Sequence, residues 1–196
     1  MNNRLEKQIE FLIEVDKMKT ILRQTLLVDK SKRENDAEHS WHFALMAMVL
    51  YEYADRSEVN IFRVLKMALV HDLIEIYAGD TFAYDEKGNE SKLERELAAA
   101  DKIFSLLPDD QRDELYALWW EFEKMETSDA KYAASIDRLQ PLINNYMTEG
   151  HTWKLGNVTS EKVYKRISII KESAPVLWDF AADIIESSIE KGYLKK

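Results

Sequence analysis

The histidine with the most informative surroundings stands next to an aspartate. His71 and Asp72 fall inside the mainly apolar stretch 67–76. An ionised aspartate in such surroundings costs several kcal/mol unless it is paired or coordinates a metal ion. On a helix the two side chains project about 100° apart, so one cation could be held only along the edge between them. Glu75 follows one helical turn later and would share their face.

Three more residues could act beside this doublet, although each also fits a structural role. His39 lies in the first turn of an expected helix, where a histidine can also bond a backbone carbonyl. His42, one turn later, fits the core or the surface as well as a place beside a ligand. Asp137 lies among apolar residues, and an ion pair with Arg138 or a distant lysine would explain it. Adjacent helical residues do not face each other, which weakens the Arg138 pairing.

The composition restricts the remaining chemistry. The chain has no cysteine, which excludes disulfides, thiolate nucleophiles and cysteine-ligated metal sites. Its formal net charge of −9 disfavours nucleic-acid polymers as partners, whereas a local positive site can still bind a small anion. The N-terminus lacks the apolar region of a signal peptide, and the longest apolar run, 43–51, is far shorter than the ~20 residues that span a bilayer. We therefore expect a soluble, cytoplasmic protein with no membrane partner.

The elements that must position these residues are predicted to be helices. The 196 residues include only 5 Gly and 3 Pro, and apolar residues recur at helical spacing, with no segment alternating at period two. Start and stop signals predict about seven helices, at 3–27, 36–54, 60–77, 91–107, 109–126, 128–148 and 160–191, the last broken near Pro175. The expected fold is an all-α, single-domain helical bundle.

Capping residues set the expected starts of several helices. Asp36 and Asn60 are predicted N-caps, because their side-chain oxygens can accept the first unpaired amides. Ser91 followed by Glu94 is typical of a capping box. Pro141 inside the sixth helix is expected to kink it, because proline removes one backbone hydrogen bond.

Two irregular stretches interrupt the helical pattern. The first, 79–90, directly follows the helix that carries the His71-Asp72 doublet, and loops of this length are usually functional or mobile. The second, 150–156, favours a plain surface loop, with a position over a cleft as the alternative.

Taken in order, His39, the His71-Asp72 doublet and Asp137 resemble the H…HD…D signature of the HD-domain metal-dependent phosphohydrolases. The likeness spans about residues 15–150. The flanking sequences are similar to the branch that contains bacterial 5′-deoxynucleotidases and their eukaryotic relatives; these flanks are 38–40, 69–75, 79–80, 106–108, 114–119 and 137–141.

The resemblance implies one divalent cation held by four residues, His39, His71, Asp72 and Asp137. Two imidazoles and two carboxylates suit Mn, Fe, Co, Ni or Zn. Glu75 matches the catalytic acidic residue of the family. In the eukaryotic relatives, the positions of Glu75 and Asp80 resemble ligands of a second, magnesium-type ion.

The resemblance also implies a substrate site. Arg23 matches an arginine that contacts the substrate phosphate, and Asp80 would contact the sugar or the second ion. Gln24 departs from the pattern, because the deoxynucleotidases carry a tryptophan there that favours deoxyribose, so the sugar preference stays open. The expected activity is phosphate release from nucleoside 5′-monophosphates. The alternatives are a phosphodiesterase, a nucleotide triphosphohydrolase or a non-catalytic metal-containing binding protein.

The resemblance finally implies how the chain is organised. We expect one HD domain over residues 1–196, with a core at about 15–150 and C-terminal helices at 160–191 packed on it. Relatives form dimers, so pairing with a second copy of the chain is an implied property, although no sequence pattern singles out an interface.

Overall fold

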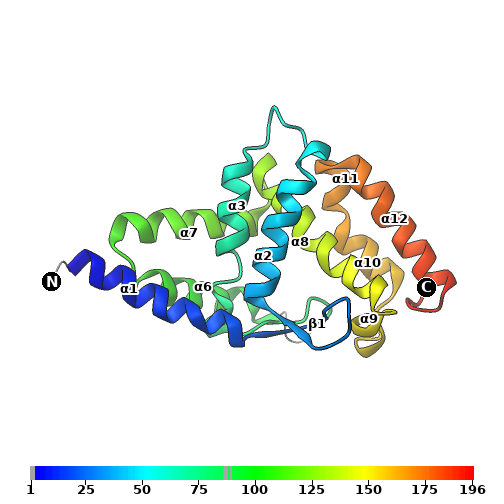
Figure 1. Ribbon diagram of the computed structural model, residues 1–196, viewed down its shortest axis with the longest axis horizontal. Coiled ribbons are helices and arrows are strands. Elements are labelled where there is room, and N and C mark those ends of the chain that lie inside the picture. The colour runs from blue at the N-terminus through cyan, green and yellow to red at the C-terminus, as the bar shows by residue number, and fades with distance from the viewer. Residues whose placement is uncertain (1–2, 86–87, 89) are drawn as a thin grey trace.

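The computed structural model describes residues 3–85, 88 and 90–196, and helices dominate it (Figure 1). Its helices are α1 (Asn3–Val15), α2 (Asp36–Val49), α3 (Ile61–Val70), α4 (Glu75–Ala78), α6 (Lys92–Phe104), α7 (Asp109–Lys124), α8 (Ser128–Met147), α9 (His151–Leu155), α10 (Ser160–Ile167), α11 (Ile169–Ser173) and α12 (Pro175–Glu190). Two short 3₁₀ helices, η1 (Asp16–Thr20) and η2 (Tyr51–Tyr53), and two strands, β1 (Leu22–Leu26) and β2 (Arg33–Asn35), complete it. The all-α prediction is confirmed. Within the described ranges, no helix is long and apolar enough to cross a membrane.

The prediction of a single helix over 3–27 is wrong. The helix ends at the start of η1, and the chain then forms β1, which pairs antiparallel with β2 and places Leu22 opposite Asn35. Leu22 is 49% exposed, whereas Thr25 is 7% exposed and the Arg23 side chain 12%. Arg23 and Thr25 face inward while Leu22 is exposed together with Gln24, so the usual alternation of a half-buried strand, apolar inward and polar outward, is not followed.

The observed helix caps agree with the prediction at one position of three. The Asn60 side chain accepts hydrogen bonds from the first amides of α3, as predicted. The N-cap of α2 is Asn35 rather than Asp36, and Asn35 forms a capping box with Glu38. Asp36 is instead fully buried. Ser91 makes no side-chain capping bond to α6.

Three predicted segments are divided differently in the structure. The segment 60–77 is interrupted, because α3 ends at Val70 and a turn separates it from α4. The segment 160–191 contains α10, α11 and α12, and the predicted loop 150–156 contains the short helix α9. Helix α8 continues through Pro141. The interruption after Val70 matters for function, because it places the His71-Asp72 doublet at a helix end.

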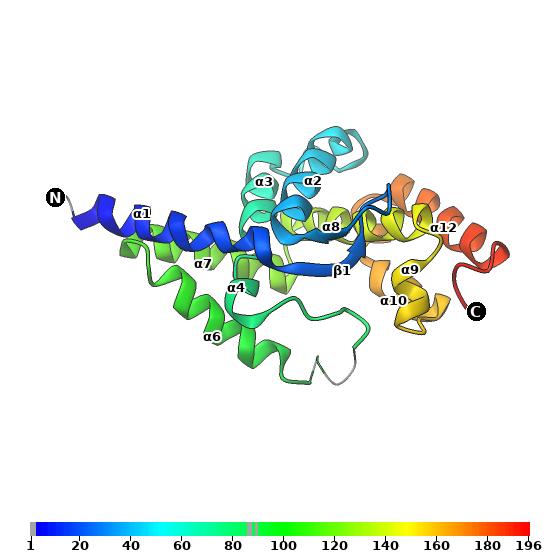
Figure 2. The same cartoon turned by 60° about the horizontal axis from the view of Figure 1, so that its bottom comes forward.

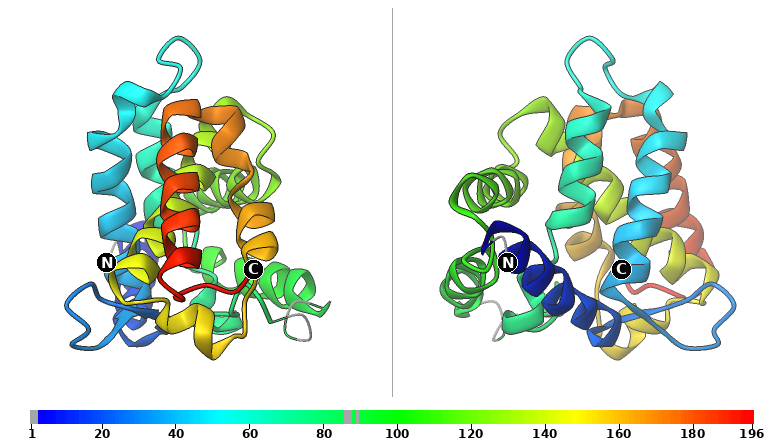
Figure 3. Two further views of the ribbon diagram at one scale, coloured as in Figure 1. Left: turned by 90° about the vertical axis from the view of Figure 1, so that its right-hand side faces the viewer. Right: turned by 60° about the vertical axis from the view of Figure 1, so that its left-hand side comes forward.

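Helix α8 is the centre of the larger hydrophobic core. It packs against α2, α3, α11 and α12, and buries Tyr132, Ile136 and Leu139. The Tyr132 hydroxyl donates a hydrogen bond to the carbonyl oxygen of Ala47 at 3.0 Å, which ties α8 to α2. A second core joins α1, α6 and α7 around Phe104 and Trp119. Helices α1, α6 and α7 lie at one end of the molecule and α9 to α12 at the other (Figures 1 and 3).

The segment between α4 and α6 begins at Gly79, whose positive φ of 75° suits glycine. Figure 2 shows it passing beside β1 before it reaches α6. Its residues Asp80 to Tyr84 line the same cavity as Arg23 of β1. The irregular stretch predicted from the sequence therefore contributes one wall of the candidate site.

Candidate metal centre

Four side chains from three regions of the fold converge beside α8. The first turn of α2 supplies His39, the end of α3 and the following turn supply His71 and Asp72, and α8 supplies Asp137. His39 Nε2 lies 3.0 Å from Asp137 Oδ1, and His71 Nε2 lies 3.1 Å from Asp72 Oδ2. The cross distances, from His39 Nε2 to Asp72 Oδ2 and from His71 Nε2 to Asp137 Oδ1, are 3.9 Å and 3.8 Å. The structure therefore brings together all four residues that the sequence singled out as metal ligands.

Hydrogen bonds on the far side of each ring fix which nitrogen faces the centre. His71 Nδ1 lies 3.0 Å from the carbonyl oxygen of Ala68, and His39 Nδ1 lies 3.1 Å from Gln140 Oε1. Oxygens of these types only accept, so Nδ1 of each ring is the donor. Nε2 of each ring therefore faces the two carboxylates, and in the neutral ring this atom offers its lone pair to a cation. This set of two nitrogens and two carboxylates fits a divalent cation.

The two aspartates remain ionised despite their burial. Burial acts to raise the pKa of Asp72, but the charge and hydrogen bond of His71 outweigh it and hold that pKa well below its usual range. Burial also acts to raise the pKa of Asp137. The hydrogen bond and charge of His39 outweigh it and hold that pKa well below its usual range. Both carboxylates are thus available as anionic ligands.

Arg23, the predicted phosphate-binding residue, lies beside the centre and contacts a candidate ligand. Its Nη1 donates a hydrogen bond to Asp72 Oδ2 at 2.9 Å. The same guanidinium lies 3.6 Å from Glu34 Oε2 and 3.7 Å from Asp36 Oδ1. These three carboxylates hold the Arg23 guanidinium beside the centre, where it can meet a phosphate.

Glu75 belongs to a second acidic group next to the first. One carboxylate oxygen each from Asp36, Asp72 and Glu75 lies within 4.8 Å of the others. Burial, with the Asp72 charge, raises the pKa of Asp36 to about 7, and burial raises the pKa of Glu75 well above its usual value. Asp80 lines the adjoining cavity, and burial raises its pKa as well. In the part of the chain that is described, the close partner of Glu75 is thus Asp36, which the sequence suggested only as a helix cap.

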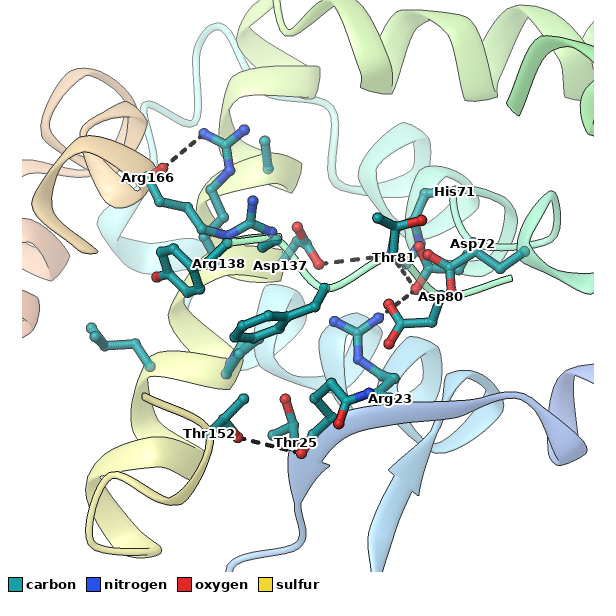
Figure 4. Close-up of a pocket in the computed structure, with 18 of the residues that line it drawn as sticks. Arg23, Thr25, His71, Asp72, Asp80, Thr81, Asp137, Arg138, Thr152 and Arg166 are labelled. Carbon is teal, nitrogen blue, oxygen red and sulfur yellow. Dashed lines mark hydrogen bonds and ion pairs between the residues drawn. The ribbon is translucent and has the colours of Figure 1, made fainter. Parts of the chain in front are cut away.

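A cavity opens from these residues (Figure 4). Its volume of about 180 Å³ is many times the roughly 10–15 Å³ that one water needs on this measure, so it has room for a small molecule. Gln24, Phe82, Thr152 and Trp153 line its walls. Because Thr152 and Trp153 belong to α9, the favoured interpretation of 150–156 as a plain surface loop is wrong, and the alternative position over a cleft is correct.

Sequence reasoning missed four residues of this region. Glu34 and Gln140 are buried behind His39, and Gln140 Nε2 donates to Glu34 Oε1 at 2.6 Å. Arg138 and Arg166 line the cavity beyond Asp137. Arg138 makes no ion pair with Asp137; it bonds the backbone oxygen of Arg166 instead. Only its position, three residues after the candidate ligand Asp137 on the same helix, could have drawn attention to Gln140.

Comparison with known proteins gives consistent similarities. The chain is 35% identical over 136 residues to the human 5′-deoxynucleotidase HDDC2. The match covers 69% of this chain and 65% of the human protein, slightly less than two thirds of its length. It is 30% identical over 155 residues to the 5′-deoxynucleotidase HDDC2 of Danio rerio, covering 79% of this chain and 76% of the relative. The crystal structure of a predicted metal-dependent phosphohydrolase from Magnetospirillum magnetotacticum is 52% identical, with a TM-score of 0.94, and the match covers 99% of this chain and 97% of that one.

More distant structures share the fold alone. An HD-domain phosphohydrolase from Listeria innocua, 19% identical, superposes with a TM-score of 0.65 over 94% of this chain and 92% of its own. The family model described as HD domain matches residues 15–178, most of the chain. This protein belongs to the HD-domain family.

Proposed function

We propose that the chain is a divalent-metal-dependent phosphomonoester hydrolase acting on nucleoside 5′-monophosphates. The observation that carries this proposal is the convergence of two Nε2 atoms and two ionised carboxylates beside a cavity that also holds Arg23. The 5′-deoxynucleotidase relatives and the similar metal-dependent phosphohydrolase support the same activity.

His39, His71, Asp72 and Asp137 would hold the catalytic ion. Their nitrogen and oxygen donors suit Mn, Fe, Co, Ni or Zn. When bound, such a cation supplies a nucleophilic water near neutral pH and neutralises phosphoryl oxygens. The hydrogen bonds from His39 to Gln140 and from His71 to Ala68 keep both rings in the ligating orientation without further adjustment.

Arg23 would bind the phosphate of the substrate. Its guanidinium is confined by Asp72, Glu34 and Asp36, so it is oriented before substrate arrives and loses little side-chain freedom on binding. A phosphate would take over Arg23 Nη1, which now donates to Asp72. A guanidinium can bind two phosphate oxygens through two parallel N–H groups.

Glu75 would hold and move a proton. Burial and the neighbouring Asp72 and Asp36 carboxylates raise its pKa well above the usual value, which favours a protonated Glu75 that can donate to the leaving sugar oxygen. Asp80 would contact the sugar, or would share a second, magnesium-type ion with Glu75. Gln24 leaves the pocket without the tryptophan that favours deoxyribose, so we expect ribo- and deoxyribonucleotides to be accepted with similar efficiency.

We also propose that the chain forms one HD domain. Residues of α10, α11 and α12 share a hydrophobic core with α2, α3 and α8, including Ile167, Ile170 and Ile185. This shared core supports cooperative folding of the C-terminal helices with the helices that carry the candidate ligands.

The test is phosphate release from ribo- and deoxyribonucleoside 5′-monophosphates, with Mn, Co, Mg and Zn added separately, beside di-, tri- and cyclic nucleotides. We expect the monophosphates to be hydrolysed best. Turnover of cyclic nucleotides or triphosphates alone would refute the monophosphate assignment. Bound metal with no phosphate release from any compound would identify a non-catalytic metal protein.

A further inference from the structure

The cavity has a second cationic region that the proposed hydrolysis does not use. In Figure 4, Arg138 and Arg166 lie on one side of Asp137, and His71, Asp72 and Asp80 lie on the other. The two arginines come from α8 and α10 and both line the cavity.

The Arg138 side chain is turned away from the metal centre. Its Nη1 donates to the backbone oxygen of Arg166 at 3.1 Å, and its Nη2 lies 2.9 Å from Met125 Sδ. Successive residues of a helix project about 100° apart, so Arg138 does not follow the direction of Asp137. The two guanidiniums are close enough for their positive charges to repel each other.

Neither guanidinium forms an ion pair within 4.0 Å of a carboxylate in the described ranges 3–85, 88 and 90–196. Arg4, Arg63 and Arg112 each contact a carboxylate at the surface, in a chain whose net charge is −9. The charges of Asp137 and Glu123 act on Arg138 only from beyond ion-pair distance. The two arginines lose hydration in the cavity and repel each other, and a bound anion would offset both costs.

A neutral donor adds to this region. Tyr84 and Trp153 line the cavity, and the Tyr84 hydroxyl can donate a hydrogen bond to an anion. The charges of Arg138 and Arg166 also act on Tyr84, so these groups lie near one another.

We propose that Arg138 and Arg166 bind a second anionic group of the substrate, a phosphate ester or a carboxylate, while the scissile phosphate meets Arg23. This inference rests on the proposed function and narrows its substrate class to phosphomonoesters that carry two separate anionic groups. Guanidinium pairs match the planar arrangement of oxygens on either group.

The experiment compares two pairs of substrates that differ by one anion. Adenosine 3′,5′-bisphosphate is compared with adenosine 5′-monophosphate, and orotidine 5′-monophosphate with uridine 5′-monophosphate. In the wild-type protein we expect kcat/KM to favour the doubly anionic member of one pair by about tenfold or more, the scale of a hydrogen bond between charged groups. The pair that shows this preference identifies the second group as a phosphate or as a carboxylate.

Variants of α10 then assign the preference to Arg166. Arg166→Gln is expected to reduce the preference about tenfold, whereas Arg166→Lys retains most of it because the charge remains. Lys165→Gln is the matched control, since it removes the same charge from an exposed neighbouring position and should leave the preference unchanged. Thermal melts establish that each variant is folded.

Two results would overturn the subsite. One is equal kcat/KM for both members of each pair in the wild-type protein. The other is an Arg166→Gln variant that loses activity by the same factor on both substrates of a pair. Arg166 would then contact the scissile phosphate or an uncharged part of the substrate. If the wild-type protein releases no phosphate at all, the proposed function fails. Calorimetry then measures the binding affinity for both members of each pair. Equal affinities within both pairs would reject the subsite.

Discussion

His39 and Gln140 are joined by a buried hydrogen bond in which His39 Nδ1 donates to Gln140 Oε1 over 3.1 Å. The Gln140 amide is itself oriented, because its Nε2 donates to Glu34 Oε1. The chain from Glu34 through Gln140 therefore sets the direction of the His39 lone pair. A residue that contacts no substrate thus controls the geometry of a candidate metal ligand.

Gln140→Leu should weaken metal binding. The leucine cannot accept the Nδ1 proton, so His39 loses its preferred tautomer, and loss of such a partner typically lowers metal affinity ~10–100-fold. Titration with Mn or Co measures the affinity. Gln111→Leu on α7 is the control, since it removes one amide hydrogen bond far from the centre. Equal metal affinity in Gln140→Leu and the wild-type protein would show that the bond has no positioning role.

His71→Ala and Asp72→Ala should each abolish phosphate release while the fold persists. Each change removes one donor of the four, and His71 sits after the last turn of α3, so the helix does not depend on its side chain. Phosphate assays test the first part and circular dichroism the second. Full activity in either variant would reject the assigned centre.

Tyr132→Phe should lower the free energy of unfolding by about 1 kcal/mol. The change removes one buried hydrogen bond between α8 and the Ala47 carbonyl, and such bonds contribute about 0.5–1.5 kcal/mol. Urea titration provides the measurement. Tyr53→Phe, at a residue that is 39% exposed, should cost less than about 0.5 kcal/mol. Equal effects of the two substitutions would contradict the role given to the Tyr132 hydroxyl.

Glu123 should make the stability of the protein depend on pH. Burial, and then the nearby Glu96, raise the pKa of Glu123 to about 7, whereas an unfolded glutamate titrates near ~4.3. A raised native pKa stabilises the fold fully below the unfolded pKa, and this contribution is lost as the pH rises towards about 7. Between about pH 5 and about pH 7 the wild-type protein should therefore lose up to about 1.4 kcal/mol per pH unit through this group.

Glu123→Gln should flatten that dependence, because glutamine does not titrate. Melting temperatures across the pH range make the comparison, with the exposed Glu126→Gln as control. Identical pH profiles for Glu123→Gln and the wild-type protein would show that Glu123 titrates normally in the folded state.

The sequence predicted the helical class from residue types and their spacing, and it predicted the four candidate ligands through the resemblance to the HD-domain family. It predicted Asn60 as a cap because a cap is a local interaction. The strand carrying Arg23 could not be predicted, since its polar side chains face the cavity instead of solvent. Gln140 and Arg166 were missed for a different reason: their partners lie far away in the chain, as with the 106 residues between Gln140 and Glu34.

Metal-dependent hydrolysis is tested by measuring phosphate release from a deoxynucleoside 5′-monophosphate before chelation, after EDTA treatment, and after Mn is restored. The metal centre described above predicts that EDTA abolishes release, that Mn restores it in the wild-type protein, and that Mn restores nothing in Asp72→Ala. Undiminished phosphate release from metal-free protein would show that hydrolysis does not depend on a metal ion at this centre.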